Sequence, residues 1–82
     1  MKQVGEVTHY YNDIGVAIVE LSGTLKVGDT VRIQGGTHDF TQEVSSLQVD
    51  HEDVESAKKG DVVGMKVTEK APDGSTVSLV EE

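Results

Sequence analysis

Apolar residues recur at alternate positions in several short segments of the chain, a period typical of β-strands that bury one face. The clearest cases are Val31 with Ile33, and the trio Val63, Met65 and Val67. This pattern, with weaker versions of it elsewhere, predicts strands over residues 3–11, 16–21, 30–33, 40–49, 63–67 and 77–79. The chain is therefore expected to be all-β.

Three segments depart from simple alternation. Residues 16–21 are apolar on both faces except for Glu20, as in a strand that is covered on both sides. Gly5 predicts a bulge or a close backbone approach, and the apolar residues of 40–49 share one face only if a bulge lies near residues 45–46. Residues 50–59 have acids first and bases last, followed by Gly60, which predicts one or two helical turns.

One turn motif occurs twice. Lys26-x-Gly28-Asp29-x-Val31-x-Ile33 returns 32 positions later as Lys58-x-Gly60-Asp61-x-Val63-x-Met65. Glycine gives the backbone unusual freedom, and aspartate can hydrogen-bond its own turn. We therefore interpret Gly28, Asp29, Gly60 and Asp61 as structural turn residues, each pair leading into a core-facing strand, rather than as carboxylates aimed at a ligand.

Composition agrees with the pattern. The chain has 14 Val, 3 Ile and 7 Thr against 4 Leu, and such β-branched side chains pack well on a pleated surface. Its 82 residues leave room for one core, and no linker or low-complexity tract interrupts them. Residues 1–82 are thus expected to form one Greek-key β-barrel of six to seven strands.

Charge narrows the functional classes. Fifteen acidic against seven basic residues give a formal net charge of −8, which opposes a broad phosphate-binding surface. The longest apolar run is 16–19, far below the roughly 20 residues of a membrane span, and no secretory signal follows Met1. We therefore expect no membrane association and a cytoplasmic location.

Metal and cofactor chemistry find little support in the sequence. Cysteine is absent, and the histidines are scattered rather than closely paired, so no metal or cofactor is expected. The acidic run around His51 lacks the spacing of a calcium loop. The glycine-rich phosphate loop of nucleotide hydrolases is also missing, and no hydroxyl nucleophile lies beside a recognisable base.

Several motifs resemble a known family. They are Gly5-x-Val7, Gly15-Val16-Ala17-Ile18-Val19-x-Leu21, Gly23-x-Leu25-x-Val27-Gly28-Asp29-x-Val31-x-Ile33, Val44-x-x-Leu47 and Val54-x-x-Ala57-x-x-Gly60-Asp61-x-Val63-Gly64. Together they resemble the second, β-barrel domain of translational GTPases such as elongation factor Tu, over nearly the whole chain. The nearest form of the pattern is that of small stand-alone translation elongation factor-like proteins, and similar barrels occur as the C-terminal module of collagenase-like peptidases.

The resemblance implies a non-catalytic binding module, because in the GTPases this barrel is an interaction platform for the nucleotide domain, RNA and the ribosome. Where the family has an Arg-Gly segment, residues 64–69 contain no arginine, which argues against transfer-RNA contact. The main expectation is a translation-linked or RNA-linked adaptor whose partner is a protein, since the charge disfavours RNA. The alternative is a detached accessory domain that docks on a collagenase-like peptidase or an RNA-modifying enzyme, and an independent small hydrolase is a third class. In isolation we expect a monomer or a weak dimer.

The candidate contact surface gathers the scarce aromatic residues, the histidines near them and the single arginine. Its members are His9, Tyr10, Tyr11, Arg32, His38 and Phe40. A guanidinium beside exposed aromatic rings suits a protein hot spot or a stack on nucleic-acid bases, and the sequence does not choose between them. The simpler interpretation is that Phe40 and one tyrosine fill the core.

Overall fold

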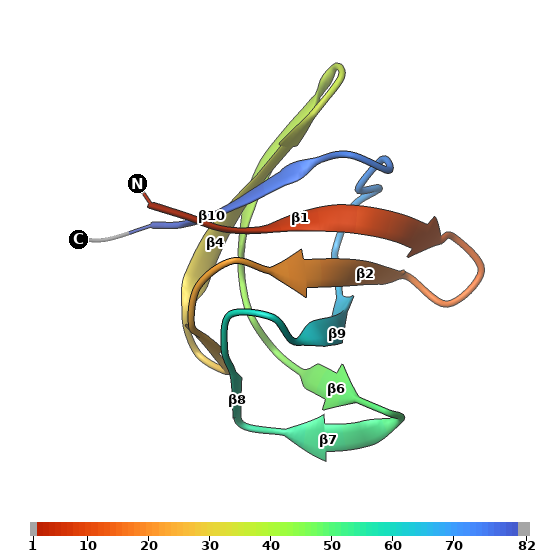
Figure 1. The fold of residues 1–82 in the computed structure, drawn as a ribbon. Coiled ribbons are helices and arrows are strands. Elements are labelled where there is room, and N and C mark those ends of the chain that lie inside the picture. Colours follow the sequence, from red (N-terminus) through yellow and green to blue (C-terminus); the bar gives the residue numbers. More distant parts are fainter. Residues whose placement is uncertain (1, 81–82) are drawn as a thin grey trace.

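Residues 2–80, the part of the chain described by the computed structural model, form ten β-strands and no helix (Figure 1). No helix that could cross a membrane is therefore found in this part of the chain. The all-β class is confirmed. The strands are β1 (Lys2–Tyr11), β2 (Val16–Leu21), β3 (Leu25–Lys26), β4 (Thr30–Gly35), β5 (His38–Glu43), β6 (Leu47–Val49), β7 (Glu52–Val54), β8 (Ser56–Ala57), β9 (Val62–Lys66) and β10 (Thr76–Leu79).

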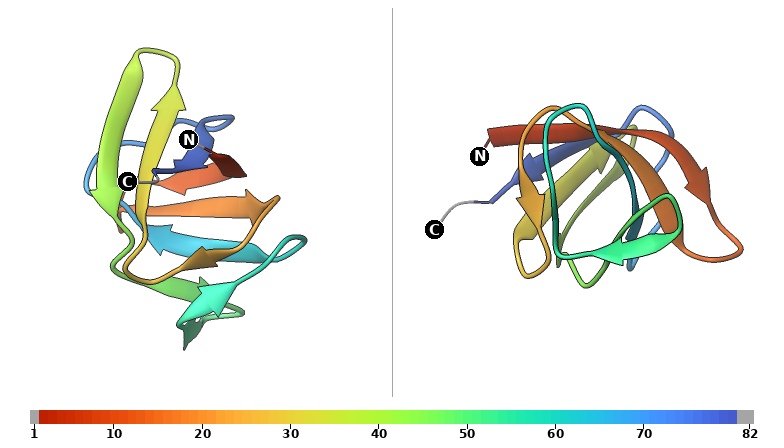
Figure 2. Two further views of the ribbon diagram at one scale, coloured as in Figure 1. Left: turned by 90° about the vertical axis from the view of Figure 1, so that its left-hand side faces the viewer. Right: turned by 60° about the horizontal axis from the view of Figure 1, so that its bottom comes forward.

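Eight of these strands make one antiparallel sheet in the order β5-β4-β10-β1-β2-β9-β6-β7, while β3 and β8 pair separately. The sheet curls around a single interior, as the two views of Figure 2 show. Among residues 2–80 no backbone ladder joins its two ends, β5 and β7, so the barrel is not closed by strand pairing. The strand number exceeds the predicted six to seven because β3, β7 and β8 are too short to show alternation.

The predicted core-facing strands bury the expected side chains. Val31 and Ile33 of β4 and Val63 and Met65 of β9 are at most 1% exposed. Apolar residues from the other strands complete the core, among them Val7, Val19, Leu25, Leu47 and Val77. A strand that shows its apolar residues to this interior and its polar residues to solvent is stable only in this register, because a one-residue shift would expose them.

The bulge expected at Gly5 is present. The pairing of β1 with β10 shifts between Gln3 and Gly5. A Cβ atom on Gly5 would lie 2.6 Å from Val19 Cγ1 and 3.0 Å from the Glu20 carbonyl oxygen, so β2 approaches this position more closely than a side chain permits. Both features anticipated for this glycine, the bulge and the close approach, are confirmed.

The helical prediction for residues 50–59 is wrong. This segment contains a hairpin between β6 and β7, in which Val49 pairs with Glu52 around the two-residue turn Asp50-His51. Asp50 and His51 have φ values of 52° and 65°, and positive φ at both central positions is the signature of the type I′ two-residue hairpin turn. The acid-to-base gradient therefore arises from a turn followed by the second Gly-Asp corner, and not from a helix.

The single strand predicted over 40–49 is also interrupted. Strand β5 ends at Glu43 and β6 begins at Leu47. Between them, Val44 donates its N–H to the Asp29 carbonyl (2.8 Å) and accepts the N–H of Gly28 (2.9 Å). The first Gly-Asp corner thus binds the backbone at Val44, and the chain bends there instead of continuing as a bulged strand.

The two Gly-Asp corners have the same geometry. Gly28 and Gly60 have φ values of 98° and 94°. Asp29 Oδ2 accepts the N–H of Lys26 (3.0 Å), and Asp61 Oδ2 accepts the N–H of Lys58 (3.1 Å). Because β3 and β8, the strands before these corners, pair antiparallel, the repeated sequence motif forms two equivalent halves of one structural unit.

Candidate interaction surface

An apolar groove of about 290 Å³ lies on the outer face of the sheet, over β2 and β9. Four large hydrophobic side chains of residues 2–80 are strongly exposed, and three of them line this groove: Tyr11 (44%), Ile14 (59%) and Val62 (52%). The remaining lining residues are Val16, Ile18, Gln48, Asp50, His51, Val63 and Gly64. The groove therefore gathers most of the strongly exposed large hydrophobic side chains in the described part of the chain.

Strand β2 explains why this face is apolar. Its alternate residues Ala17, Val19 and Leu21 enter the core, while Val16 and Ile18 point outward and remain half-buried. The sequence predicts a strand covered on both sides, but the outer residues of β2 border an open groove. The structure thus shows a face with the composition of a covered strand and without a complete cover.

Gly64 forms the floor of the groove. It pairs with Ile18 of β2 on one side and with Gln48 of β6 on the other. A Cβ atom at this position would contact Val16 Cγ1 at 3.5 Å and Ile18 Cδ1 at 3.8 Å, which are ordinary van der Waals distances. Gly64 has no positive φ. A side chain at residue 64 is therefore compatible with the fold and would occupy the groove.

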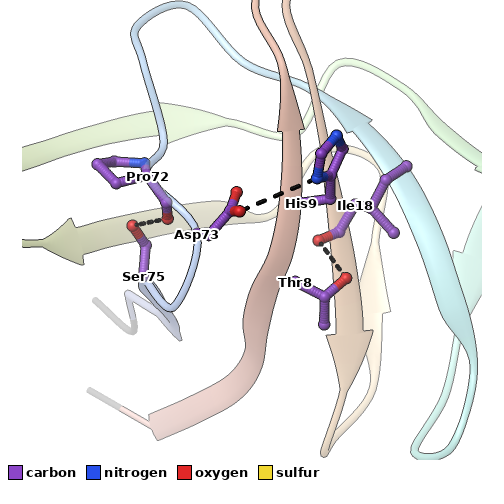
Figure 3. Close-up of polar contacts among 6 residues, drawn as sticks. All are labelled: Thr8, His9, Ile18, Pro72, Asp73 and Ser75. Atoms are coloured by element: carbon purple, nitrogen blue, oxygen red, sulfur yellow. Dashed lines mark hydrogen bonds and ion pairs between the residues drawn. The ribbon is translucent and has the colours of Figure 1, made fainter.

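Two of the six predicted contact residues join this surface. The register of β1 and β2 places His9 opposite Ile18 and Tyr11 opposite Val16. The His9 and Tyr11 rings meet edge to face, with centroids 4.4 Å apart. Figure 3 shows His9 beside Ile18, with Asp73 on its other side, where His9 Nδ1 lies 3.9 Å from Asp73 Oδ2.

The other four predicted residues lie elsewhere or serve the core. Phe40 is 8% exposed and belongs to the core, and Tyr10 packs against the core while partly exposed. Arg32 and His38 belong to the β4–β5 hairpin, which projects away from the β1–β2 hairpin in both Figure 1 and Figure 2. The six residues therefore do not form one surface.

Arg32 has an intramolecular partner. Its Nε donates to Asp39 Oδ1 at 2.8 Å, and a terminal guanidinium nitrogen donates to Asp39 Oδ2. The hydrogen bond and charge of Arg32 lower the pKa of the Asp39 carboxyl, and Asp39 in turn raises the pKa of Arg32. A guanidinium held in this bidentate pair is not free to stack on the aromatic residues of β1.

Carboxylates lie in the groove and beside it. Asp50 lines it directly, and Glu20 pairs across the strands with the groove residue Val62. Glu20 also lies opposite Glu6 of β1, and both side chains are exposed. Among the basic residues, His51 lines the groove and Lys66 is paired with the groove residue Val16. The groove is therefore apolar at its centre and predominantly acidic around it.

Residues 2–80 contain no group of three His, Cys, Asp or Glu side chains arranged to hold a metal ion. The side-chain hydroxyls with hydrogen bonds serve the fold, since Ser75 donates to the Pro72 carbonyl and Thr8 to the Ile18 carbonyl (Figure 3). This surface is therefore suited to apolar contacts with a partner, with charged side chains at its border. Ile14, Val16, Ile18, Val62 and Gly64 were not predicted from sequence as site residues, although the two apolar faces of 16–21 were a signal for them.

Comparisons with known proteins agree with this fold. Residues 16–78 match the family model of elongation factor Tu domain 2. An uncharacterized protease from Methanocaldococcus jannaschii is 42% identical over 81 residues, which cover 98% of this chain but only 20% of the protease. The whole protease is thus about five times the length of the matching segment.

Solved structures give the same architecture. The C-terminal domain of a putative U32 peptidase from Geobacillus thermoleovorans superposes with a TM-score of 0.91, at 20% identity, over 98% of this chain and 93% of that domain. Its selenomethionine variant gives a TM-score of 0.90, at 21% identity, over 95% and 99% of the two chains. These relatives are peptidase-type proteins and not stand-alone translation factors. By its sequence match over residues 16–78, the chain belongs to the elongation factor Tu domain 2 family.

Proposed function

We propose that this chain is a non-catalytic accessory domain that docks on a U32 peptidase-type enzyme. The observation that carries the proposal is the match, at 42% identity, of nearly the whole chain to one fifth of a larger protease. The likeness in fold to a U32 peptidase C-terminal domain supports the same assignment. Docking of a small β-barrel on a larger enzyme requires a contact surface on the barrel. The groove over β2 and β9 is an apolar surface available for this contact.

Two features support a binding role rather than catalysis. The conspicuous carboxylates Asp29 and Asp61 are hydrogen-bonded to their own turns. The groove is lined mainly by apolar side chains, with Tyr11, Asp50 and His51 as its titratable members. Such a surface can bury apolar groups of a partner.

A translation-linked adaptor is the second candidate, and the family match over residues 16–78 is the observation that favours it. In this case a protein partner is preferred to RNA, because a net charge of −8 opposes phosphate binding. The two candidates share a fold and differ only in the partner.

Partner capture distinguishes them. The immobilised chain is offered a U32 peptidase-type enzyme from the same cells, lacking its own C-terminal domain, and separately purified ribosomes and elongation factors. The proposal predicts capture of the enzyme at both low and high salt, because apolar contacts persist when charges are screened. Capture of translation components without the enzyme would contradict it and favour the second candidate.

A further inference from the structure

We propose that the groove over β2 and β9 docks a partner segment that carries apolar side chains flanked by lysine or arginine. This inference rests on the proposed accessory-domain function, since the segment would belong to the peptidase-type enzyme. It adds the location of the contact and the chemistry of the partner. The groove and its acidic surroundings each contribute one part of the argument.

The apolar side chains expected in the partner segment follow from the composition of β2, which carries apolar residues on its outer face as well as its inner face. A strand with one face toward solvent normally alternates apolar and polar residues. Val16 and Ile18 break this rule on the outer face, and Val62 of β9 extends the same apolar surface with 52% of its area exposed. Contiguous exposed apolar surface rimmed by polar residues marks interaction sites. Gly64 keeps the floor between these side chains open, so that an inserted side chain has room.

The lysine or arginine expected in the partner segment follows from a pair of glutamates that has no basic partner within the described part of this chain. Glu6 and Glu20 face each other directly across β1 and β2, an arrangement that destabilises a sheet. Between Lys2 and Val80, the side-chain contacts of basic with acidic groups within 4.0 Å are Arg32–Asp39 and His9–Asp73, the latter an ion pair only when His9 is protonated, so neither glutamate has a cationic partner there. A lysine or arginine of the partner would relieve this repulsion while apolar side chains fill the neighbouring groove.

Other occupants fit less well. A second copy of the chain would bring its own Glu20 and Asp50 to the interface, together with another net charge of −8. A nucleic acid would bring phosphates to the same carboxylates. Acidic surroundings of an apolar groove favour a cationic partner through electrostatic complementarity, which sets both specificity and association rate.

Peptide titration tests the chemistry. The isotopically labelled chain is titrated with a synthetic peptide of alternating leucine and lysine, and with a matched peptide of leucine and glutamate, while backbone amide shifts are recorded. The inference predicts that the basic peptide shifts the amides of Ile18, Val62 and Gly64 and that the acidic peptide does not. Shifts confined to other strands, equal binding of both peptides, or no binding by the basic peptide would overturn it.

Matched variants test the location. Val62→Thr and Val27→Thr each alter an exposed valine (52% and 42% exposed), but only Val62 lines the groove. Val62→Thr should weaken peptide binding about fourfold, the equivalent of one buried methylene, and Val27→Thr should not. In the same way, Glu20→Gln beside the groove should weaken binding of the basic peptide, and the control Glu43→Gln on β5 should not. Gly64→Val should block the groove. Equal losses in the test and control variants would overturn the assignment, and thermal unfolding verifies that every variant is folded.

The two proposals fail in different ways. If the peptidase-type enzyme is captured and Gly64→Val captures it equally well, the accessory function stands and the docking surface is wrong. If the basic peptide binds the groove but the enzyme is not captured, the surface stands and the assignment of its partner is wrong.

Discussion

The side-chain carbonyl oxygen of Gln42 accepts a hydrogen bond from the backbone N–H of Thr68 at 2.8 Å. This side-chain hydrogen bond connects two segments of residues 2–80 between which no backbone strand pairing forms. The same side chain donates to the Lys66 carbonyl at 2.9 Å. Gln42 lies on β5, one end of the curled sheet, whereas Lys66 is the last residue of β9 and Thr68 follows two residues after it. This buried amide therefore links two parts of the sheet that no strand pairing joins, and it helps to hold the barrel in its curled form.

Replacing Gln42 with methionine should lower the free energy of unfolding by about 1–3 kcal/mol, because it leaves the Thr68 N–H and Lys66 carbonyl without this partner. Urea unfolding measures the change. The control is Gln48→Met, whose exposed amide bonds Asp53 at 3.1 Å and should contribute less than about 0.5 kcal/mol. Equal effects would show that the Gln42 link is not a significant element of the fold.

Alanine at either Gly-Asp corner should be destabilising. Gly28 and Gly60 have φ values of 98° and 94°, where a Cβ atom is unfavourable, so Gly28→Ala or Gly60→Ala should cost about 1–2 kcal/mol. Gly64→Ala is the matched control, since Gly64 has no positive φ and its Cβ would meet only ordinary contacts. A melting temperature unchanged by Gly28→Ala would remove the corners from the account of the fold.

The Arg32–Asp39 pair should make a small, pH-dependent contribution to stability. Since Arg32 lowers the pKa of Asp39 in the folded state from 3.8, the contribution is present above pH 3.8 and disappears as the pH falls through the lowered value. The side chains of Arg32 and Asp39 are 35% and 46% exposed, so screening by solvent keeps the effect small. Carboxyl chemical shifts should report a pKa for Asp39 that rises in Arg32→Gln, and an unchanged pKa would contradict the pairing in solution.

The chain alone should be a monomer at low salt and at most a weak dimer when salt screens its charge. A net charge of −8, with Asp50 in the apolar groove and Glu20 beside it, opposes self-association through that face. Light scattering over a salt series measures the mass. A tight dimer at low salt would mean that copies of the chain cover the groove themselves.

The sequence predicted the fold best where β-strand alternation was long and regular. Val31, Ile33, Val63 and Met65 were expected in the core and lie there. The hairpin turn at Asp50-His51 was missed because its left-handed backbone has no glycine to signal it, and residues common in a helical first turn occur beside it. The interruption near Val44 depends on hydrogen bonds to a corner fifteen residues earlier, which local patterns do not contain.

The candidate site was harder to predict because it depends on which face each residue presents and on neighbours distant in sequence. His9 and Tyr11 were predicted and lie next to the groove, whereas Arg32 is on another hairpin and pairs with Asp39. Grouping residues by chemistry alone could not show this separation. The groove forms only where β2, β6 and β9 lie side by side. The place of Gly64 in it can therefore be recognised only from the pairing of Gly64 with Ile18 and Gln48.

Calorimetric titration of the chain into a U32 peptidase-type enzyme that lacks its own C-terminal domain tests the central claim most directly. We predict saturable binding with a negative heat-capacity change, as expected when apolar surface is buried. Binding should be lost in Gly64→Val and retained in Val27→Thr. Absence of binding by the unmodified chain, or equal binding by Gly64→Val, would contradict the account.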